Sequence, residues 1–385
     1  MFSSRTGWDL TENRLTSLLA AKRQAGTHVL DLTESNPTRV GISRPADLLT
    51  PFAQAASLAY EPHPRGLRAA RQAVAADYAR RGARLDPDRV VLTSSTSEAY
   101  AFLFKLLCDP GDAILVPHPS YPLFEYLARL ESVEVGGYPL LYDGAWHLDP
   151  AAVADAMTPR VRAVILVSPN NPTGSYVKRD EAERLLDECA RRDVAVVCDE
   201  VFADYVFADG GRRPATLAGD SPALLFSLGG LAKSCGLPQL KLSWIAVSGP
   251  NAVRDQALAR LEIVADTFLS VSTPVQHAAP ALLGRLQELQ APIASRVASN
   301  LRSARRLAAG SAASLLEPEG GWYAVLRVPA TVPEEERVCG LLEARNVLVH
   351  PGYFFDFPHE AFLVLSLLPA EQDFVDGVTR VLTEV

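Results

Sequence analysis

Lys233 stands in a sequence context that can turn a lysine into a nucleophile. It lies in a turn of small residues that follows the apolar run 224–228. Desolvation behind a buried strand lowers the pKa of an amine and lets it attack carbonyl groups. A surface lysine in a turn is the ordinary alternative, but only five of the chain's 37 Lys and Arg residues are lysines. A lysine kept in such an arginine-rich chain is therefore our first candidate for chemistry.

A run of hydroxyl residues follows a second apolar stretch, 89–93, and precedes a predicted helix over 98–107. Hydroxyls and free backbone N–H groups at a helix N-terminus can bind an anion. An ordinary N-cap needs only one Ser or Thr, whereas four hydroxyl residues stand here in succession. The run therefore favours a phosphate site, which we assign to Ser95, Thr96 and Ser97.

Three more side chains follow apolar runs in the same way. Tyr121 lies between prolines and could stack on a flat ring, Asn171 lies in the rigid turn SPNNPTG, and Asp199 follows the run 194–198. Each has an ordinary explanation in packing, turn formation or a cap. As a set with Lys233 they match what pyridoxal phosphate requires: a phosphate cradle, a stacked ring, a Schiff-base lysine and a carboxylate at the pyridine nitrogen.

The predicted elements around these residues alternate between apolar strands and helices. Strands that are apolar throughout indicate a sheet covered on both faces, which is the doubly wound α/β class. In such sheets the polar chemistry gathers at the carboxyl ends of the strands. The strands are predicted at 89–93, 113–116, 161–167, 194–198, 224–228 and 242–247, with helices at 10–25, 67–81, 98–107, 123–130 and 179–192.

Beyond residue 251 the pattern changes to long helices and shorter strands, which predicts a second, α+β layer. A helix over 278–307 is expected to kink or break near Pro292. The short strands are predicted at 323–328, 347–350 and 362–367.

Composition excludes several other classes of protein. The net charge of −8 without a basic stripe argues against nucleic-acid binding, and no apolar run approaches the roughly 20 residues of a membrane span. The N-terminal residues lack the apolar segment of a secretory signal. Five scattered cysteines indicate reduced thiols, and seven histidines without ligand spacing predict no metal site. We therefore expect a cytoplasmic protein without nucleic-acid or membrane partners.

Taken together, these motifs resemble the class I/II aminotransferases, which are pyridoxal phosphate enzymes of fold type I. The resemblance runs from the Asn36–Pro37 turn through SPNNPTG and GLAKSCGLPQLKLSW to the turn at Pro351–Gly352. It implies a large domain over 45–270, with a mostly parallel seven-stranded sheet between helices. A smaller α+β domain would be formed by 1–44 and 271–385. The implied cofactor is pyridoxal 5'-phosphate.

The resemblance also implies roles for single residues. Lys233 would form the Schiff base and move the proton, Asp199 would partner the pyridine nitrogen, Asn171 would donate to the ring oxygen and Tyr121 would stack on the ring. Ser95, Thr96, Ser97 and Lys241 would hold the phosphate. Tyr60 resembles a tyrosine that reaches the phosphate of a neighbouring subunit, which implies a homodimer with shared active sites.

Three departures from the family pattern concern the cofactor. Lys241 stands where an arginine is usual, and an ammonium lacks the bidentate fork of a guanidinium. Phe202 stands where a tyrosine is common, so the ring oxygen loses a donor. Gly230 replaces a hydroxyl residue three positions before Lys233.

The fourth departure concerns the substrate. The family usually has an arginine near the C-terminal strand that binds the α-carboxylate, and Val364 takes its place here. A buried carboxylate without a partner is costly, so the substrate lacks this group or another cation binds it. Arg39, beside Asn36, is our first candidate for that cation, with Arg327 and Arg345 behind it.

The leading functional hypothesis is an aminotransferase that moves an amino group from an amino donor to an oxo acceptor. A lyase catalysing carbon–sulfur β-elimination, or a decarboxylase, is the alternative on the same fold, because fold does not fix the reaction. A non-catalytic cofactor-binding sensor is the third hypothesis. The sequence leaves the donor, the acceptor and the pathway open.

Overall fold

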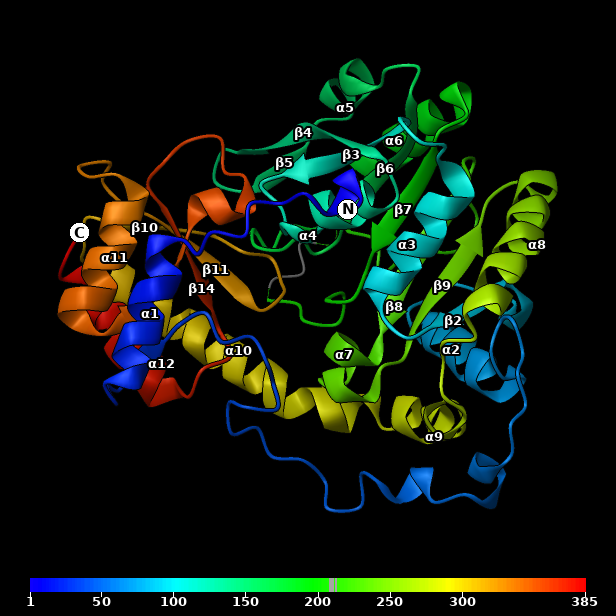
Figure 1. Cartoon of the computed structure of the whole chain (residues 1–385), viewed down its shortest axis with the longest axis horizontal. Coiled ribbons are helices and arrows are strands. Elements are labelled where there is room, and N and C mark those ends of the chain that lie inside the picture. The colour runs from blue at the N-terminus through cyan, green and yellow to red at the C-terminus, as the bar shows by residue number, and fades with distance from the viewer. Residues whose placement is uncertain (208–210, 212) are drawn as a thin grey trace.

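A large mixed sheet forms one side of the molecule in the computed structural model, which describes residues 1–207, 211 and 213–385. Its strand order is β2-β9-β8-β7-β6-β3-β4-β5 (Figure 1). The strands from β8 to β4 run parallel, while β9 is antiparallel to both of its neighbours and β5 is antiparallel to β4. The bounds are β2 Val90–Thr93, β3 Ala113–His118, β4 Glu134–Tyr142, β5 Trp146–Leu148, β6 Val161–Val167, β7 Ala195–Asp199, β8 Leu225–Gly230 and β9 Ser243–Ser248.

Helices cover both faces of this sheet, as the apolar strands predicted. Along β6 and β7, Ile165 and Val197 pack on one face, while their neighbours Val164 and Val196 pack on the other. This alternation follows from the period-2 geometry of a strand. The first face is covered by α3 (Thr96–Leu107), α4 (Leu123–Leu130) and α8 (Asn251–Phe268); the second by α2 (Arg68–Arg80), α5 (Pro150–Ala156), α6 (Arg179–Arg192) and α9 (Thr273–Gly284).

A smaller antiparallel sheet of order β10-β11-β14-β13 forms the other side of the molecule. Its strands pack against helices from both ends of the chain, and the two-stranded pair of β1 and β12 lies among them. Figure 1 shows the long α10 running from beneath the large sheet to this second group. The bounds are β1 Leu30–Asp31, β10 Ser314–Leu316, β11 Tyr323–Arg327, β12 Val347–Leu348, β13 His350–Pro351, β14 Phe362–Ser366, α1 Arg14–Gln24, α10 Leu286–Ala308, α11 Glu334–Arg345 and α12 Glu371–Leu382.

Two sequence predictions need correction. The large sheet has eight strands rather than seven, because the short strand β5 adds to the edge of β4. The helical break predicted near Pro292 falls at Arg285, between α9 and α10. Pro292 lies inside α10, and the helix continues through it.

Helix starts also differ from the predictions where a cap decides them. α1 begins at Arg14 rather than at residue 10, because the side chain of Asn13 accepts the amide N–H of Thr16 at 2.8 Å. α3 begins two residues earlier than predicted, since Ser95 is its N-cap. This earlier start places Thr96 and Ser97 in the first turn of α3.

The division of the chain at residues 44/45 and 270/271 stays a prediction. Within the fold, α9 packs on α2 beside the large sheet, and α10 carries the chain from there to the smaller sheet. No helix in the described part of the chain is long and apolar enough to cross a membrane.

Gly230 pairs with Ser243 across β8 and β9, and this contact gives the third departure a physical reason. A Cβ at Gly230 would lie 3.0 Å from the Ser243 Cβ and would overlap its hydroxyl. The φ of Gly230 is extended and allows any residue, so the only obstacle to a side chain there is the lack of space. The side chain of Ser243 therefore occupies the volume that a hydroxyl side chain at position 230 would need.

We expect Gly230→Ser to destabilise the protein by roughly 1–3 kcal/mol, because the new side chain overfills a packed strand pair. The double variant Gly230→Ser/Ser243→Gly should recover most of this loss, since it exchanges the two positions. Urea unfolding of the wild type, both single variants and the double variant measures the coupling. Additive losses in the double variant would contradict the steric explanation.

Candidate active site

A cavity of about 760 Å³ opens at the carboxyl ends of β2, β3, β6, β7 and β8. It lies between the large sheet and the smaller one, because its lining also includes residues of β11 and β13. The predicted residues that the fold brings together in this lining are Thr96, Ser97, Tyr121, Asn171, Asp199 and Lys233.

Lys233 lies in the short helix α7 (Leu231–Ser234), directly after β8. Its Nζ is 5.1 Å from the ring centroid of Trp322 and 5.4 Å from that of Phe202. Burial lowers the pKa of the amine to about 8, although the charge of Asp199 raises it. The backbone is also held, since the Tyr205 hydroxyl donates to the Lys233 carbonyl oxygen at 2.8 Å. Close to neutral pH, the amine is thus much nearer its neutral, nucleophilic form than an ordinary lysine.

Asp199 ends β7 and is almost fully buried. Its carboxylate accepts hydrogen bonds from the Tyr100 hydroxyl at 3.1 Å and from the Val201 amide at 3.1 Å. Burial nevertheless raises the pKa of Asp199 to about 6, against the lowering effects of these donors and of Lys233. Because burial makes its negative charge unfavourable, this carboxylate is suited to a positively charged partner in the cavity.

Asn171 carries an unsatisfied polar atom at the same place. Its Oδ1 is buried and has no hydrogen-bond partner among the described residues. The hydroxyl of Tyr323 lies near the side chains of Asn171 and Ser35, and burial raises the pKa of this phenol to about 12. The Asn171 side chain also lines the cavity, so its amide group is placed to contact a polar ligand atom there.

The predicted phosphate residues divide into two groups. Thr96 and Ser97 line the cavity from the first turn of α3, whereas the Ser95 hydroxyl caps that helix by accepting the Glu98 amide at 3.1 Å. Lys241 is exposed and adopts a left-handed conformation between α7 and β9. Neither Ser95 nor Lys241 is in the cavity lining, in the part of the chain that the structure describes.

None of the three arginine candidates lies in the cavity lining. Arg39 is exposed after the Asn36 turn, and Arg327 is exposed on β11. Arg345 forms an ion pair with Glu384 instead.

The residue that replaces the family's arginine is buried. Val364 lies in β14 and pairs with Val325 on one side and with His350 on the other. Asn36, the other predicted substrate contact, uses its Oδ1 within its own turn by accepting the Thr38 amide at 3.0 Å and the Thr38 hydroxyl at 2.7 Å. The structure therefore leaves the predicted substrate contacts outside the described lining.

Several residues of the site escaped the sequence analysis because they come from elements that do not end at the sheet edge. Tyr100 reaches Asp199 from the second turn of α3, one helical turn after Thr96. Tyr323 and His350 reach the cavity from the smaller sheet, and Trp322, directly before β11, contacts Lys233; all three lie more than 80 residues after Lys233. The aromatic pair in the glycine-rich segment 320–323 was the available signal.

The family comparison decides the identity of this site. The pattern of "Aminotransferase class I and II" matches residues 27–372, which is most of the chain. This chain is a class I/II aminotransferase. It is an enzyme that transfers amino groups, and the carbon–sulfur lyase alternative is not favoured.

Curated relatives of this aminotransferase act on different amino acids. It is 27% identical to the alanine aminotransferase of Mycobacterium tuberculosis over 377 residues, covering 94% of this chain and 86% of the relative. It is 29% identical to the human tyrosine aminotransferase over 318 residues, covering 78% of this chain and 68% of the relative.

Solved structures share the fold of this aminotransferase. The alanine aminotransferase of Pyrococcus furiosus superposes with a TM-score of 0.88 at 23% identity, covering 99% of this chain and 98% of that chain. A mutant aspartate aminotransferase of Thermus thermophilus gives 0.87 at 22% identity, covering both chains completely. The expected fold type I architecture is thereby confirmed.

Aminotransferases of this class and fold use pyridoxal phosphate. The residues present fit this cofactor on grounds of their own. A lysine with a lowered pKa, a buried carboxylate with a raised pKa and an amide side chain line one cavity at the start of α3. Lys233, Asp199 and Asn171 are therefore the residues that could hold its aldehyde carbon, ring nitrogen and ring oxygen.

In the cofactor-free chain, we expect the Lys233 amine to titrate near pH 8, because burial outweighs the attraction of Asp199. The amine is charged and unreactive below this pH and becomes reactive above it. Acetic anhydride labelling between pH 6 and pH 11, read by mass spectrometry on the Lys233 peptide, gives the midpoint. Asp199→Asn should lower the midpoint further, since it removes the charge that raises the pKa. A midpoint near the ordinary value of about 10.4 would contradict the buried environment.

Proposed function

We propose that this aminotransferase takes its amino group from α-amino acids with uncharged, apolar side chains. The observation that carries the proposal is the composition of the cavity lining. Aromatic rings surround the space next to Lys233, and the acidic residues Glu125 and Asp356 also line it. A second carboxylate on the substrate would need a second cation. Among the described lining residues, only Lys233 and His350 can carry a positive charge.

Two curated relatives are named for amino acids of the same substrate class. The curated relatives include enzymes named for alanine and for tyrosine, both of which are amino acids without a charged side chain. The space next to Phe202, Tyr323 and Phe354 is apolar enough to accept side chains of either kind. The oxo acceptor would be the corresponding class of 2-oxo acid.

The protein residues divide the work around the cofactor. Pyridoxal phosphate supplies an aldehyde that takes up the amino group and a ring that stabilises negative charge at the substrate Cα. The Lys233 Nζ would bind the cofactor and would move the proton to and from that Cα. Asp199 holds a proton at the ring nitrogen, because a buried carboxylate stabilises a positive neighbour.

The remaining residues bind and orient. The Asn171 amide would donate to the ring oxygen, and the half-exposed Tyr121 would cover the ring and shield it from water. Thr96 and Ser97 offer hydroxyl and backbone donors to the phosphate from the first turn of α3. Ser95 supports that turn as its cap.

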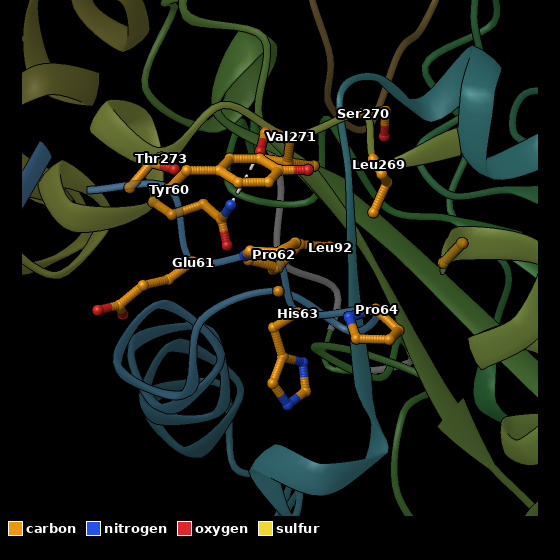
Figure 2. A pocket seen from close by; sticks show the side chains of 13 residues that line it. Tyr60, Glu61, Pro62, His63, Pro64, Leu92, Leu269, Ser270, Val271 and Thr273 are labelled. Atoms are coloured by element: carbon orange, nitrogen blue, oxygen red, sulfur yellow. Dashed lines mark hydrogen bonds between the residues drawn. The ribbon is translucent and has the colours of Figure 1, made fainter. Parts of the chain in front are cut away.

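We also infer a homodimer in which each subunit completes the partner's site. Tyr60 has 74% of its surface exposed and is absent from the described lining of the cavity around Lys233. Figure 2 shows its ring near Val271, above Pro62, at a separate surface pocket. Leu269, which lines the same pocket, and Leu58, two residues before Tyr60, are also exposed apolar side chains. A second copy would cover them and receive the Tyr60 hydroxyl.

All five cysteines are free, which supports the cytoplasm as the location.

The function is tested by single-turnover spectra of the cofactor-loaded enzyme. Alanine and phenylalanine should each discharge the visible absorption band in proportion to enzyme and release one equivalent of 2-oxo acid. Aspartate and lysine should react at least tenfold more slowly, because their charged side chains would be left unpaired. Faster reaction with aspartate would overturn the proposed substrate class.

Lys233→Ala provides the control for the covalent role. Borohydride reduction of the wild type should attach the cofactor to Lys233, as read by mass spectrometry, and the alanine variant should show no adduct. Release of ammonia during turnover, in place of a retained amino group, would argue for elimination instead of transfer.

Hybrid dimers test the shared site. Neither Lys233→Ala nor Tyr60→Phe homodimers should reach wild-type activity. A hybrid of the two subunits should regain one intact site, because the wild-type lysine of one chain would meet the wild-type tyrosine of the other. Amino-transfer rates of hybrids purified through two different tags measure this. Hybrids that stay at the Tyr60→Phe level would place the tyrosine's action within its own subunit.

A further inference from the structure

An α-amino acid brings a carboxylate into the cavity, and the position of the family's arginine cannot bind it. Val364 is fully buried and apolar. The three arginines predicted as substitutes lie outside the described lining. Lys233 is committed to the cofactor, so His350 remains as the one other lining residue of the described chain that can become a cation.

The register of the smaller sheet places His350 beside the missing arginine. His350 in β13 pairs directly with Val364 in β14, in an antiparallel ladder. Directly opposed residues project to the same face of a sheet, with Cβ atoms about 4.5–5.5 Å apart. The imidazole therefore occupies the neighbourhood from which an arginine at position 364 would reach the substrate, and it lines the cavity while Val364 does not.

The imidazole is fixed but has free nitrogens. Its ring lies 5.6 Å from the Phe355 ring and 6.0 Å from the Phe354 ring, measured between centroids. Neither ring nitrogen has a hydrogen-bond partner among the described residues, and the residue lines the cavity. Two aromatic contacts thus hold the ring while its donors stay available to a ligand.

We propose that His350, as an imidazolium, binds the α-carboxylate of the substrate in place of the family's arginine. The inference rests on the proposed function, because it requires an α-amino acid as the substrate. A charge-assisted hydrogen bond from a ring nitrogen to a carboxylate oxygen supplies both the charge and the orientation.

The charges around His350 set how this contact depends on pH. Burial lowers the pKa of the free imidazole, and Asp31 on β1 raises it. Glu334 on α11 directs its oxygens to the backbone N–H groups of Tyr353 and Phe362, at 3.0 and 2.7 Å. Glu125 and Asp356 line other parts of the cavity, and β14 brings apolar residues against the ring.

The sign of the pH dependence follows from these charges. A free enzyme with a lowered His350 pKa is largely neutral at this residue at pH 8, whereas a bound carboxylate favours the imidazolium. Carboxylate binding therefore takes up a proton at high pH, and affinity falls as the pH rises above the pKa of the free imidazole. An arginine in this place would stay charged throughout.

The test uses 3-phenylpropanoate, a carboxylate that lacks the amino group and cannot react, on the cofactor-loaded enzyme. We expect its dissociation constant to rise about tenfold per pH unit above the pKa of His350. Calorimetry in buffers of different ionisation enthalpy should show uptake of close to one proton per ligand at pH 8. His350→Asn should weaken binding roughly 10–100-fold at pH 6 and remove the proton uptake.

Two further variants separate the contact from a structural effect. His350→Arg should bind 3-phenylpropanoate with little dependence on pH. His359→Asn, at an exposed histidine outside the described lining, should behave as the wild type does. Unchanged affinity and proton uptake in His350→Asn would overturn the proposal and assign the carboxylate to another cation, such as one from a partner subunit.

The test also separates this inference from the proposed function. If no α-amino acid discharges the visible absorption band while 2-phenylethylamine does, the substrate class is wrong. In that case, if His350→Asn also leaves the affinity for 3-phenylpropanoate unchanged, the proposed carboxylate site is overturned as well. If amino acids react but His350→Asn leaves their KM unchanged at both pH 6 and pH 8, only the role of His350 fails.

Discussion

The structure depends on one electrostatic arrangement, in which an amine and a carboxylate share a cavity that solvates neither well. Lys233 lies close to the Phe202 and Trp322 rings. Asp199 is the last residue of β7, which pairs with β8, the strand that precedes Lys233. Burial lowers the pKa of the amine to about 8 and raises that of the carboxyl to about 6. Both groups are therefore left short of a partner. A cofactor with an electrophilic carbon and a basic ring nitrogen satisfies both needs.

The two sheets contribute different parts of this arrangement. The parallel strands of the large sheet bring Thr96, Asn171, Asp199 and Lys233 to one edge, because the carboxyl ends of parallel strands lie together. The smaller sheet supplies the aromatic wall and His350. The cofactor residues thus follow from the order of strands, whereas the substrate side depends on how the second layer packs against the first.

Three of the four departures from the family pattern have separate physical explanations. Gly230 is small because Ser243 on the paired strand fills its space. Phe202 packs against Trp322 and lies beside Lys233, so its loss of a hydroxyl is accompanied by a more apolar setting for the amine. Val364 packs inside the smaller sheet. Its neighbour on β13 is His350, the residue that we propose for binding the carboxylate. No described contact of Lys241 explains its replacement of an arginine.

The sequence by itself determined the α/β class, the family and the residues at the strand ends, because apolar strands followed by polar turns place chemistry at a predictable edge. It also located β6, α4 and α6 at their observed bounds. It missed β4, in which Gly136 and Gly137 allow close approach to Leu115 and His118. Tertiary structure alone decided which distant residues join the cavity, since His350 and Tyr323 reach it through strand register and packing that no local pattern records.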